Sequence, residues 1–180
     1  MAKKVLIIST SIRNNSNSEI LAKEAEKGAK DAGHEVEFVS LKDKDIKFCK
    51  GCLACQKLGH CVINDDANDI TEKIKNSDVI VWATPVYYYE MCGQMKTVID
   101  RANSLFCSDY KFREVYLITA SADDGDDVAQ TVINGVNGWI ACFDGVKFCG
   151  YVSGGGLNNP SDAENHPQLL QQAYNLGKNI

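Results

Sequence analysis

The chain has 180 residues, of which 44% are hydrophobic and 24% charged, and its formal net charge is -5. This size and composition predict one compact domain over residues 1–180, with a core large enough to fold without stabilising cross-links. The negative charge, with no lysine- or arginine-rich block, argues against nucleic-acid binding. No apolar run has the length that a bilayer requires, so we expect no membrane partner. The apolar stretch after Lys3 and Lys4 is too short for a signal peptide, which favours a cytoplasmic protein.

The first predicted element is a buried strand over residues 4–10, and a helix over residues 18–31 follows it. The loop between them is dense in hydroxyl and amide side chains and carries one arginine, Arg13. Because a helix N-terminus presents free N–H groups and partial positive charge, this loop suits an anion. It has neither a P-loop nor a glycine-rich dinucleotide motif, so we predict a terminal monophosphate. An ordinary solvated N-cap is the alternative.

Four clustered cysteines follow the second predicted strand, which covers residues 36–39. Their spacing is C-x2-C-x2-C-x5-C, and they are Cys49, Cys52, Cys55 and Cys61. Such compact runs let three thiolates converge on one face of a [4Fe-4S] cluster, whereas structural zinc sites usually use two separated pairs. A redox thiol set, a transient metal site and cysteines without a cluster are the competing interpretations. We predict that the other four cysteines are small core residues: Cys92, Cys107, Cys142 and Cys149.

The next helix is predicted to have Asn68 or Asp69 near its N-terminus, and the third strand to cover residues 78–85. The loop after this strand contains Pro85, which stiffens the turn, and three consecutive tyrosines. Aromatic side chains at a ligand-bearing edge of a sheet suit a flat ring system. A dimer interface or a cap on the core is the alternative, above all for Tyr89.

The remaining predicted elements are a helix over residues 91–105, a strand over 114–120, a helix over 128–142, a strand over 146–152 and a helix over 168–178. Five strands that alternate with five helices predict an α/β fold with a doubly wound parallel sheet and helices on both faces. Ligands of such sheets bind beyond the carboxyl ends of the strands. We therefore expect the chemistry in three loops, at residues 9–18, 84–92 and 120–127.

Several segments together resemble the NADPH-dependent FMN reductase branch of the flavodoxin superfamily. The matching segments are residues 11–18, 49–55, 61–66, 77–80, 84–88, 93–96 and 99–101. The resemblance implies a flavodoxin-like sheet in the strand order 2-1-3-4-5 and FMN as the cofactor. It also implies that the three loops bind FMN through Ser9, Ser11, Arg13, Ser16, Asn17, Ser18, Thr84, Pro85, Val86, Tyr87, Tyr88, Ala120 and Ser121.

The cysteine run resembles that of iron–sulfur flavoproteins, which share this fold and carry a four-iron cluster beside FMN. On that resemblance the four clustered cysteines are the metal ligands. Two positions of the first loop depart from the family pattern, because Thr10 and Ile12 stand where relatives often have glycine and proline. The third loop is unusually acidic, and its carboxylates would repel the extra phosphate of NADPH.

The resemblance implies an NAD(P)H-dependent oxidoreductase that passes electrons from a nicotinamide through FMN to a small acceptor, such as a flavin or a quinone. We expect a ping-pong reaction in which the nicotinamide leaves before the acceptor enters, with no protein side chain as catalyst. An electron-transfer module fed by a ferredoxin-like partner is the second hypothesis, and a binding module without flavin is the third. Relatives are usually homodimers or homotetramers, so we expect an oligomer.

Overall fold

The computed structural model describes residues 1–180 and contains one main sheet of parallel strands. The strands are β1 (Lys4–Ser9), β2 (Glu35–Ser40), β3 (Val79–Tyr87), β5 (Glu114–Ala120) and β6 (Lys147–Gly154). Their order is β2-β1-β3-β5-β6, and each neighbouring pair is parallel. This is the predicted order 2-1-3-4-5, so the flavodoxin-like doubly wound α/β fold is confirmed.

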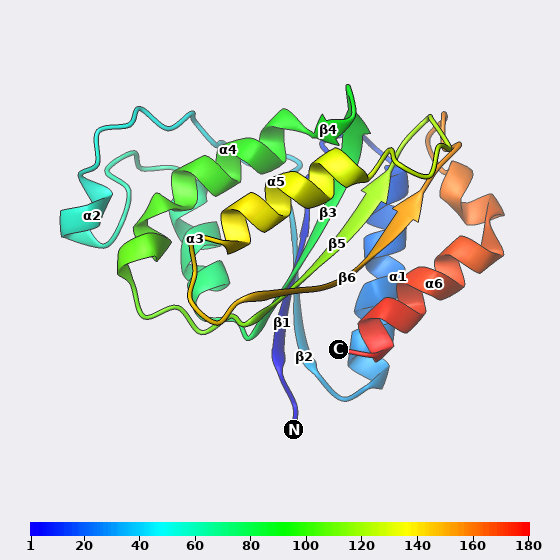
Figure 1. Cartoon of the computed structure of the whole chain (residues 1–180), viewed down its shortest axis with the longest axis horizontal. Helices are drawn as coiled ribbons and strands as arrows, with labels where there is room; N and C mark the ends of the chain where they lie inside the picture. Colours follow the sequence, from blue (N-terminus) through cyan, green and yellow to red (C-terminus); the bar gives the residue numbers. More distant parts are fainter.

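Helices cover both faces of the sheet (Figure 1). On one side lie α1 (Asn17–Asp31) and α6 (Pro167–Lys178), and on the other lie α3 (Ala67–Lys75), α4 (Gly93–Arg101) and α5 (Gln130–Ile140). Glycine lets α1 and α6 approach closely, because a Cβ on Gly177 would lie 1.9 Å from the carbonyl oxygen of Ala25. The short helices are α2 (Cys55–Leu58), η1 (Ala102–Cys107) and η2 (Asp162–Asn165). No helix combines the length and apolar character needed to cross a bilayer.

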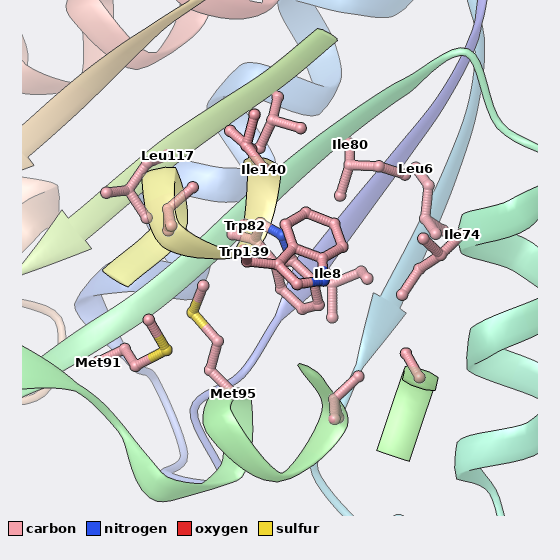
Figure 2. Packing of buried hydrophobic residues seen from close by; sticks show 14 of the residues in the cluster. Leu6, Ile8, Ile74, Ile80, Trp82, Met91, Met95, Leu117, Trp139 and Ile140 are labelled. Carbon is pink, nitrogen blue, oxygen red and sulfur yellow. The ribbon is translucent and has the colours of Figure 1, made fainter. Parts of the chain in front are cut away.

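Alternate residues of each central strand supply the two hydrophobic layers, as the two-residue period of a strand requires. Leu6 and Ile8 of β1 belong to the larger cluster, under α3, α4 and α5, whereas Val5 and Ile7 belong to the smaller one, under α1 and α6. Figure 2 shows the larger cluster, in which Trp82 of β3 meets Trp139 of α5 edge to face. Their ring centroids are 5.7 Å apart. The core therefore fixes β3 firmly just before its carboxyl end enters the candidate site.

The segment after β3 differs from the prediction. We expected a loop there, but β3 continues to Tyr87 and turns back into the short antiparallel strand β4 (Glu90–Met91). The two turn residues, Tyr88 and Tyr89, have φ values of 51° and 62°. These lie in the left-handed region that a tight hairpin turn demands, and bulky residues adopt it rarely. The tyrosine run gives no signal for such a turn, which is usually made by Asn or Gly.

Three of the four cysteines predicted for the core are exposed, so that prediction was wrong for Cys107, Cys142 and Cys149. Cys92 is buried, as predicted. Apolar neighbours in sequence do not guarantee a shared face, since Cys142 follows the end of α5 and Cys149 lies on the outermost strand, β6. The predicted helix over residues 91–105 is also divided, because α4 ends at Arg101 and continues as the 3-10 helix η1.

Candidate functional site

The three predicted loops meet at the carboxyl ends of β1, β3 and β5 and enclose a cavity of about 160 Å³. Residues of every predicted loop line this cavity, together with two residues that follow β6. They are Ser11, Arg13, Ser16, Asn17, Ser18, Pro85, Val86, Tyr87, Ala120, Ala122, Leu157 and Asn158. The position agrees with the rule that open α/β sheets bind ligands at the topological switch point.

One end of the cavity is the N-terminus of α1. Ser16 occupies the N-cap position, but no side chain caps the helix, so the N–H groups of its first turn have no protein partner. The hydroxyl oxygens of Ser16 and Ser18 lie 3.1 Å apart, and both residues are buried. Arg13 lines the same cavity from an exposed position. Free N–H groups, hydroxyls and one guanidinium form a site that suits a phosphate group.

Asn17 faces this cavity, but its side chain already has partners in the protein. Its Nδ2 donates to the carbonyl oxygens of Leu157 and Asn159, and its Oδ1 accepts from the N–H of Ala163, at 3.4, 2.8 and 3.1 Å. The amide therefore holds the segment after β6 against the start of α1. Of the groups of Asn17, the backbone N–H is the one left for a ligand.

The opposite wall of the cavity is the end of β3, from Pro85 to Tyr87. The hairpin tip beyond it is tied to the third loop, because the Tyr89 hydroxyl donates to Asp123 at 2.7 Å. This hydrogen bond, with one from the N–H of Gly125, lowers the pKa of Asp123 below its ordinary value and raises the pKa of Tyr89. The contact links the β3–β4 hairpin to the acidic third loop.

Four of the residues predicted to bind the cofactor lie outside the cavity lining, namely Ser9, Thr84, Tyr88 and Ser121. Three of them hold the loops in place: Ser9 donates to Glu19, Thr84 accepts from the N–H of Cys92, and Ser121 donates to the carbonyl oxygens of Asp123 and Gly154. Tyr88 is fully exposed at the hairpin tip. Their direct contact with the cofactor stays a prediction.

The residues that the sequence reasoning missed, Leu157 and Asn158, follow β6. The available signal was the run Gly154-Gly155-Gly156 at the carboxyl end of the last strand. A Cβ on Gly155 would lie only 2.7 Å from the Cα of Asp124, so glycine is needed where this segment passes the third loop. Consecutive glycines at a strand end mark such an approach and add this segment to the site.

The four clustered cysteines border a second cavity, of about 450 Å³, beyond the C-terminal end of α4. Two of the sulfurs already accept hydrogen bonds, since Asn103 Nδ2 lies 3.3 Å from Cys55 Sγ and the Gly51 N–H lies 3.4 Å from Cys49 Sγ. No three cysteine, histidine or carboxylate side chains are grouped closely enough to hold one ion. The donor set, four soft thiols that border one cavity and two N–H groups that donate to sulfur, has the chemistry of an iron–sulfur site.

A buried ion pair stands beside the cysteines. Arg101 and Asp65 have fully buried side chains and contact each other at 2.6 and 2.8 Å. Burial would raise the pKa of Asp65, but hydrogen bonds from Arg101 and from the N–H groups of Lys47 and Ala67 lower it below its ordinary value. The pKa of Arg101 is raised, mainly by Asp65 and further by the neighbouring Cys61 thiol. Both groups are therefore charged at neutral pH.

Comparison with known families decides the class of protein. The model of the family described as NADPH-dependent FMN reductase matches residues 3–141. The chain belongs to this family. FMN reductases are flavoprotein oxidoreductases, so the predictions of FMN as the cofactor and of an NAD(P)H-dependent oxidoreductase are confirmed.

The chain is also similar to proteins of the two expected kinds. The chain is 32% identical over 183 residues to an iron–sulfur flavoprotein of Methanocaldococcus jannaschii. The alignment covers 98% of this chain and 95% of the relative. It is 28% identical to a protein of Bacillus subtilis named as an NAD(P)H-dependent FMN-containing oxidoreductase, over 97% of both chains. The resemblance of the chain to iron–sulfur flavoproteins is thus confirmed.

Solved structures agree on the fold of this FMN reductase family member. The NAD(P)H:quinone oxidoreductase from Methanothermobacter marburgensis superposes with a TM-score of 0.79 and covers 99% of this chain and 96% of its own. Its sequence identity is 17%. At this identity the likeness extends to the architecture alone.

Proposed function

We propose that FMN lies in the cavity between the three loops and that the protein passes electrons from NAD(P)H to a small acceptor, such as a quinone or a flavin. One observation carries the proposal: an uncapped helix N-terminus and a wall of proline, valine and tyrosine border the same cavity. The first suits a phosphate and the second suits a flat ring. A ligand with a phosphate at one end and a ring system at the other satisfies both.

The residues divide by role along the cavity. The hydroxyls of Ser11, Ser16 and Ser18 would hold the phosphate with the free N–H groups of α1, and Arg13 would pair with its charge. The ring would lie against Pro85–Tyr87. Bound FMN supplies hydride acceptance at N5 and release of electrons singly or in pairs. The protein supplies position and a shielded wall, so no side chain is needed as an acid or a base.

The choice between NADH and NADPH depends on the third loop. Asp123, Asp124, Asp126 and Asp127 are all exposed there, next to the residues that line the cavity. Their field would repel the additional phosphate of NADPH if the nucleotide crossed this loop. Tyr87 on the β3–β4 hairpin offers an exposed aromatic surface to the nicotinamide. Because the tip of this hairpin is hydrogen-bonded to Asp123, we propose that NADH is the preferred donor.

We further propose a homodimer or homotetramer that functions in the cytoplasm. Tyr88 projects fully exposed from the hairpin tip beside the cavity, where a second copy of the chain would bury it. All eight cysteines are free, which suits a reducing compartment. Light scattering on the purified flavoprotein measures the oligomeric state, and a monomer at micromolar concentration would contradict the assembly.

A second function is favoured by the cysteine cavity: an iron–sulfur flavoprotein that moves electrons between a ferredoxin-like donor and an acceptor. The four thiols around one cavity and the match to an iron–sulfur flavoprotein over almost the entire chain support it. The two functions share the flavin site and differ in the electron donor.

Anaerobic purification tests both functions in one preparation. We expect a flavin absorption spectrum, about one FMN per chain, and bleaching when NADH or NADPH is added in stoichiometric amount. Bleaching by reduced ferredoxin alone, together with iron and acid-labile sulfide, would select the electron-transfer module instead. A colourless protein that takes up no FMN would contradict both functions.

A further inference from the structure

One arginine side chain joins the two ends of the cysteine segment. Arg101 Nη1 donates to the carbonyl oxygen of Lys47 at 2.7 Å, and Nη2 donates to that of Ile63 at 3.1 Å. Both nitrogens also donate to Asp65, whose carboxylate accepts in turn from the N–H of Lys47 at 2.9 Å. Residues 49–61 lie between these anchoring points. The guanidinium therefore closes the segment into a loop at the C-terminal end of α4.

The part of this segment that precedes α2 has little regular structure of its own. No backbone N–H from Phe48 to Ala54 donates to a backbone carbonyl, and Cys49 and Cys52 are exposed. The ion pair of Arg101 and Asp65, in contrast, has no exposed side-chain surface. Burying two charges costs free energy that their attraction only repays when further hydrogen bonds satisfy them. Such a clamp on an otherwise open loop indicates that the position of the loop matters.

One of the N–H donors of the Arg101 side chain has no acceptor. An arginine side chain has five N–H donors. Four of them reach the two carbonyl oxygens and the carboxylate, whereas the Nε atom is buried and has no partner. Arg101 borders the same cavity as Cys61 and the other three cysteines. An unpaired buried donor is costly, so an acceptor in this cavity that came within reach of Nε would remove that cost.

We propose that Arg101 is a positioning residue for the cysteine site, which closes the cysteine segment and donates its remaining Nε–H to the sulfur of Cys61 when the four thiolates gather around an iron–sulfur cluster. Asn103, two residues further along the chain, already donates to Cys55 in the same way. The end of α4 and the start of η1 would then form the ordered half of the site. This inference rests on the proposal that the cysteines hold iron and sulfide.

The test compares Arg101→Lys with the control Lys96→Met in protein purified without oxygen and reconstituted with ferrous iron and sulfide. Lysine keeps the charge but cannot reach two carbonyls, a carboxylate and a sulfur at once. We expect Arg101→Lys to retain its FMN and to bind iron and sulfide about tenfold or more weakly, the usual cost of losing an outer-shell partner. Lys96→Met breaks an exposed pair with Asp100 on the same helix and should load like the wild type.

The reduction potential of the cluster separates positioning from simple structural support. Hydrogen bonds to ligand sulfurs stabilise the more negative, reduced cluster, so the cluster that still forms in Arg101→Lys should have a lower potential. Asp65→Asn weakens the clamp but keeps the Nε–H and leaves the Arg101 charge unpaired, so its clusters should be fewer and their potential should not fall. Electron paramagnetic resonance during a mediated redox titration measures the amount of cluster and its reduction potential.

Wild-type loading and wild-type potential in Arg101→Lys would overturn the inference. If Arg101→Lys fails to fold, Asp65→Asn decides, since undiminished iron content in that variant would be equally fatal. A wild type that holds FMN and bleaches with a nicotinamide but never takes up iron overturns this inference and leaves the flavin proposal intact. A wild type that takes up iron but no FMN overturns the flavin proposal and leaves this inference intact.

Discussion

The flavin cavity and the cysteine loop (residues 49–61) lie at opposite ends of α4 and are built in different ways. At the Gly93 end, the cavity walls are the ends of buried strands, and hydroxyl and amide side chains bond them to one another. At the Arg101 end, the cysteine loop extends away from the sheet and is fixed through its two ends (Figure 1). A helix of nine residues separates the two regions, a length of about 14 Å.

This difference teaches how one fold can carry two kinds of site. A cofactor with a rigid ring and a phosphate is bound by groups that the sheet already holds in position, so little ordering is needed on binding. A metal cluster on the four cysteines would be bound by thiolates that first have to gather, so part of the binding free energy would order the protein. We expect the two regions to respond independently to substitution.

Removal of one partner of the buried ion pair gives the largest expected effect. Asp65→Ala leaves the Arg101 charge buried and unpaired, which should lower the free energy of unfolding by about 3–5 kcal/mol. Urea unfolding measures this loss, and limited proteolysis should cut the cysteine loop first. Asp100→Ala, which breaks the exposed pair with Lys96, should cost at most about 1 kcal/mol. If the Asp65→Ala variant also bound FMN more weakly than the wild type, the two regions would not be independent.

Arg13→Ala probes the other region and should have the next largest effect. The exposed guanidinium lines the phosphate end of the cavity, and a charge-assisted hydrogen bond to phosphate contributes about 1.5–3 kcal/mol. FMN affinity should therefore fall about 10- to 150-fold, as measured by quenching of flavin fluorescence. Arg113→Ala is the matched control, because Arg113 is exposed and bonds to carbonyl oxygens of Tyr110 and Phe112 near the amino end of β5. Equal affinity in the Arg13 and Arg113 variants would refute the assignment of Arg13.

The sequence predicted the residues that line the cavity at the strand ends better than those that organise the cysteine loop, and the reason is physical. Strand periodicity and the switch-point rule locate the loops at residues 9–18, 84–92 and 120–127, because backbone topology alone brings strand ends together. Which side chains then face the ligand depends on local bonds. The sequence does not reveal that the Asn17 amide holds the segment after β6, or that Ser121 turns toward Gly154.

For the cysteine loop, spacing identified the four thiols but not the residues that organise them. Arg101 and Asp65 are 36 positions apart, and neither stands out from the many charged residues of the chain. Their pairing arises because α4 and the segment before α3 pack together, a tertiary contact without periodic signal. The exposure of Cys107, Cys142 and Cys149 has the same origin, since burial depends on which face a residue takes.

Tyr89→Phe makes the smallest expected change and tests how rigid the flavin cavity is at its rim. The substitution removes the hydrogen bond between the hairpin tip and Asp123, so the pKa of Asp123 should rise toward its ordinary value. Because the folded-state pKa of this carboxyl is depressed, its contribution to stability is present above the ordinary aspartate pKa and is lost as pH falls through the depressed value. Carboxyl ¹³C NMR titration measures the shift, and Tyr174→Phe, which removes an exposed bond to Asp31, should leave Asp123 unchanged. FMN affinity should change less than about twofold, since the bond is exposed and lies outside the cavity lining. A larger loss would mean that the third loop is held over the cavity by Tyr89 and that the flavin region, like the cysteine region, depends on a clamp.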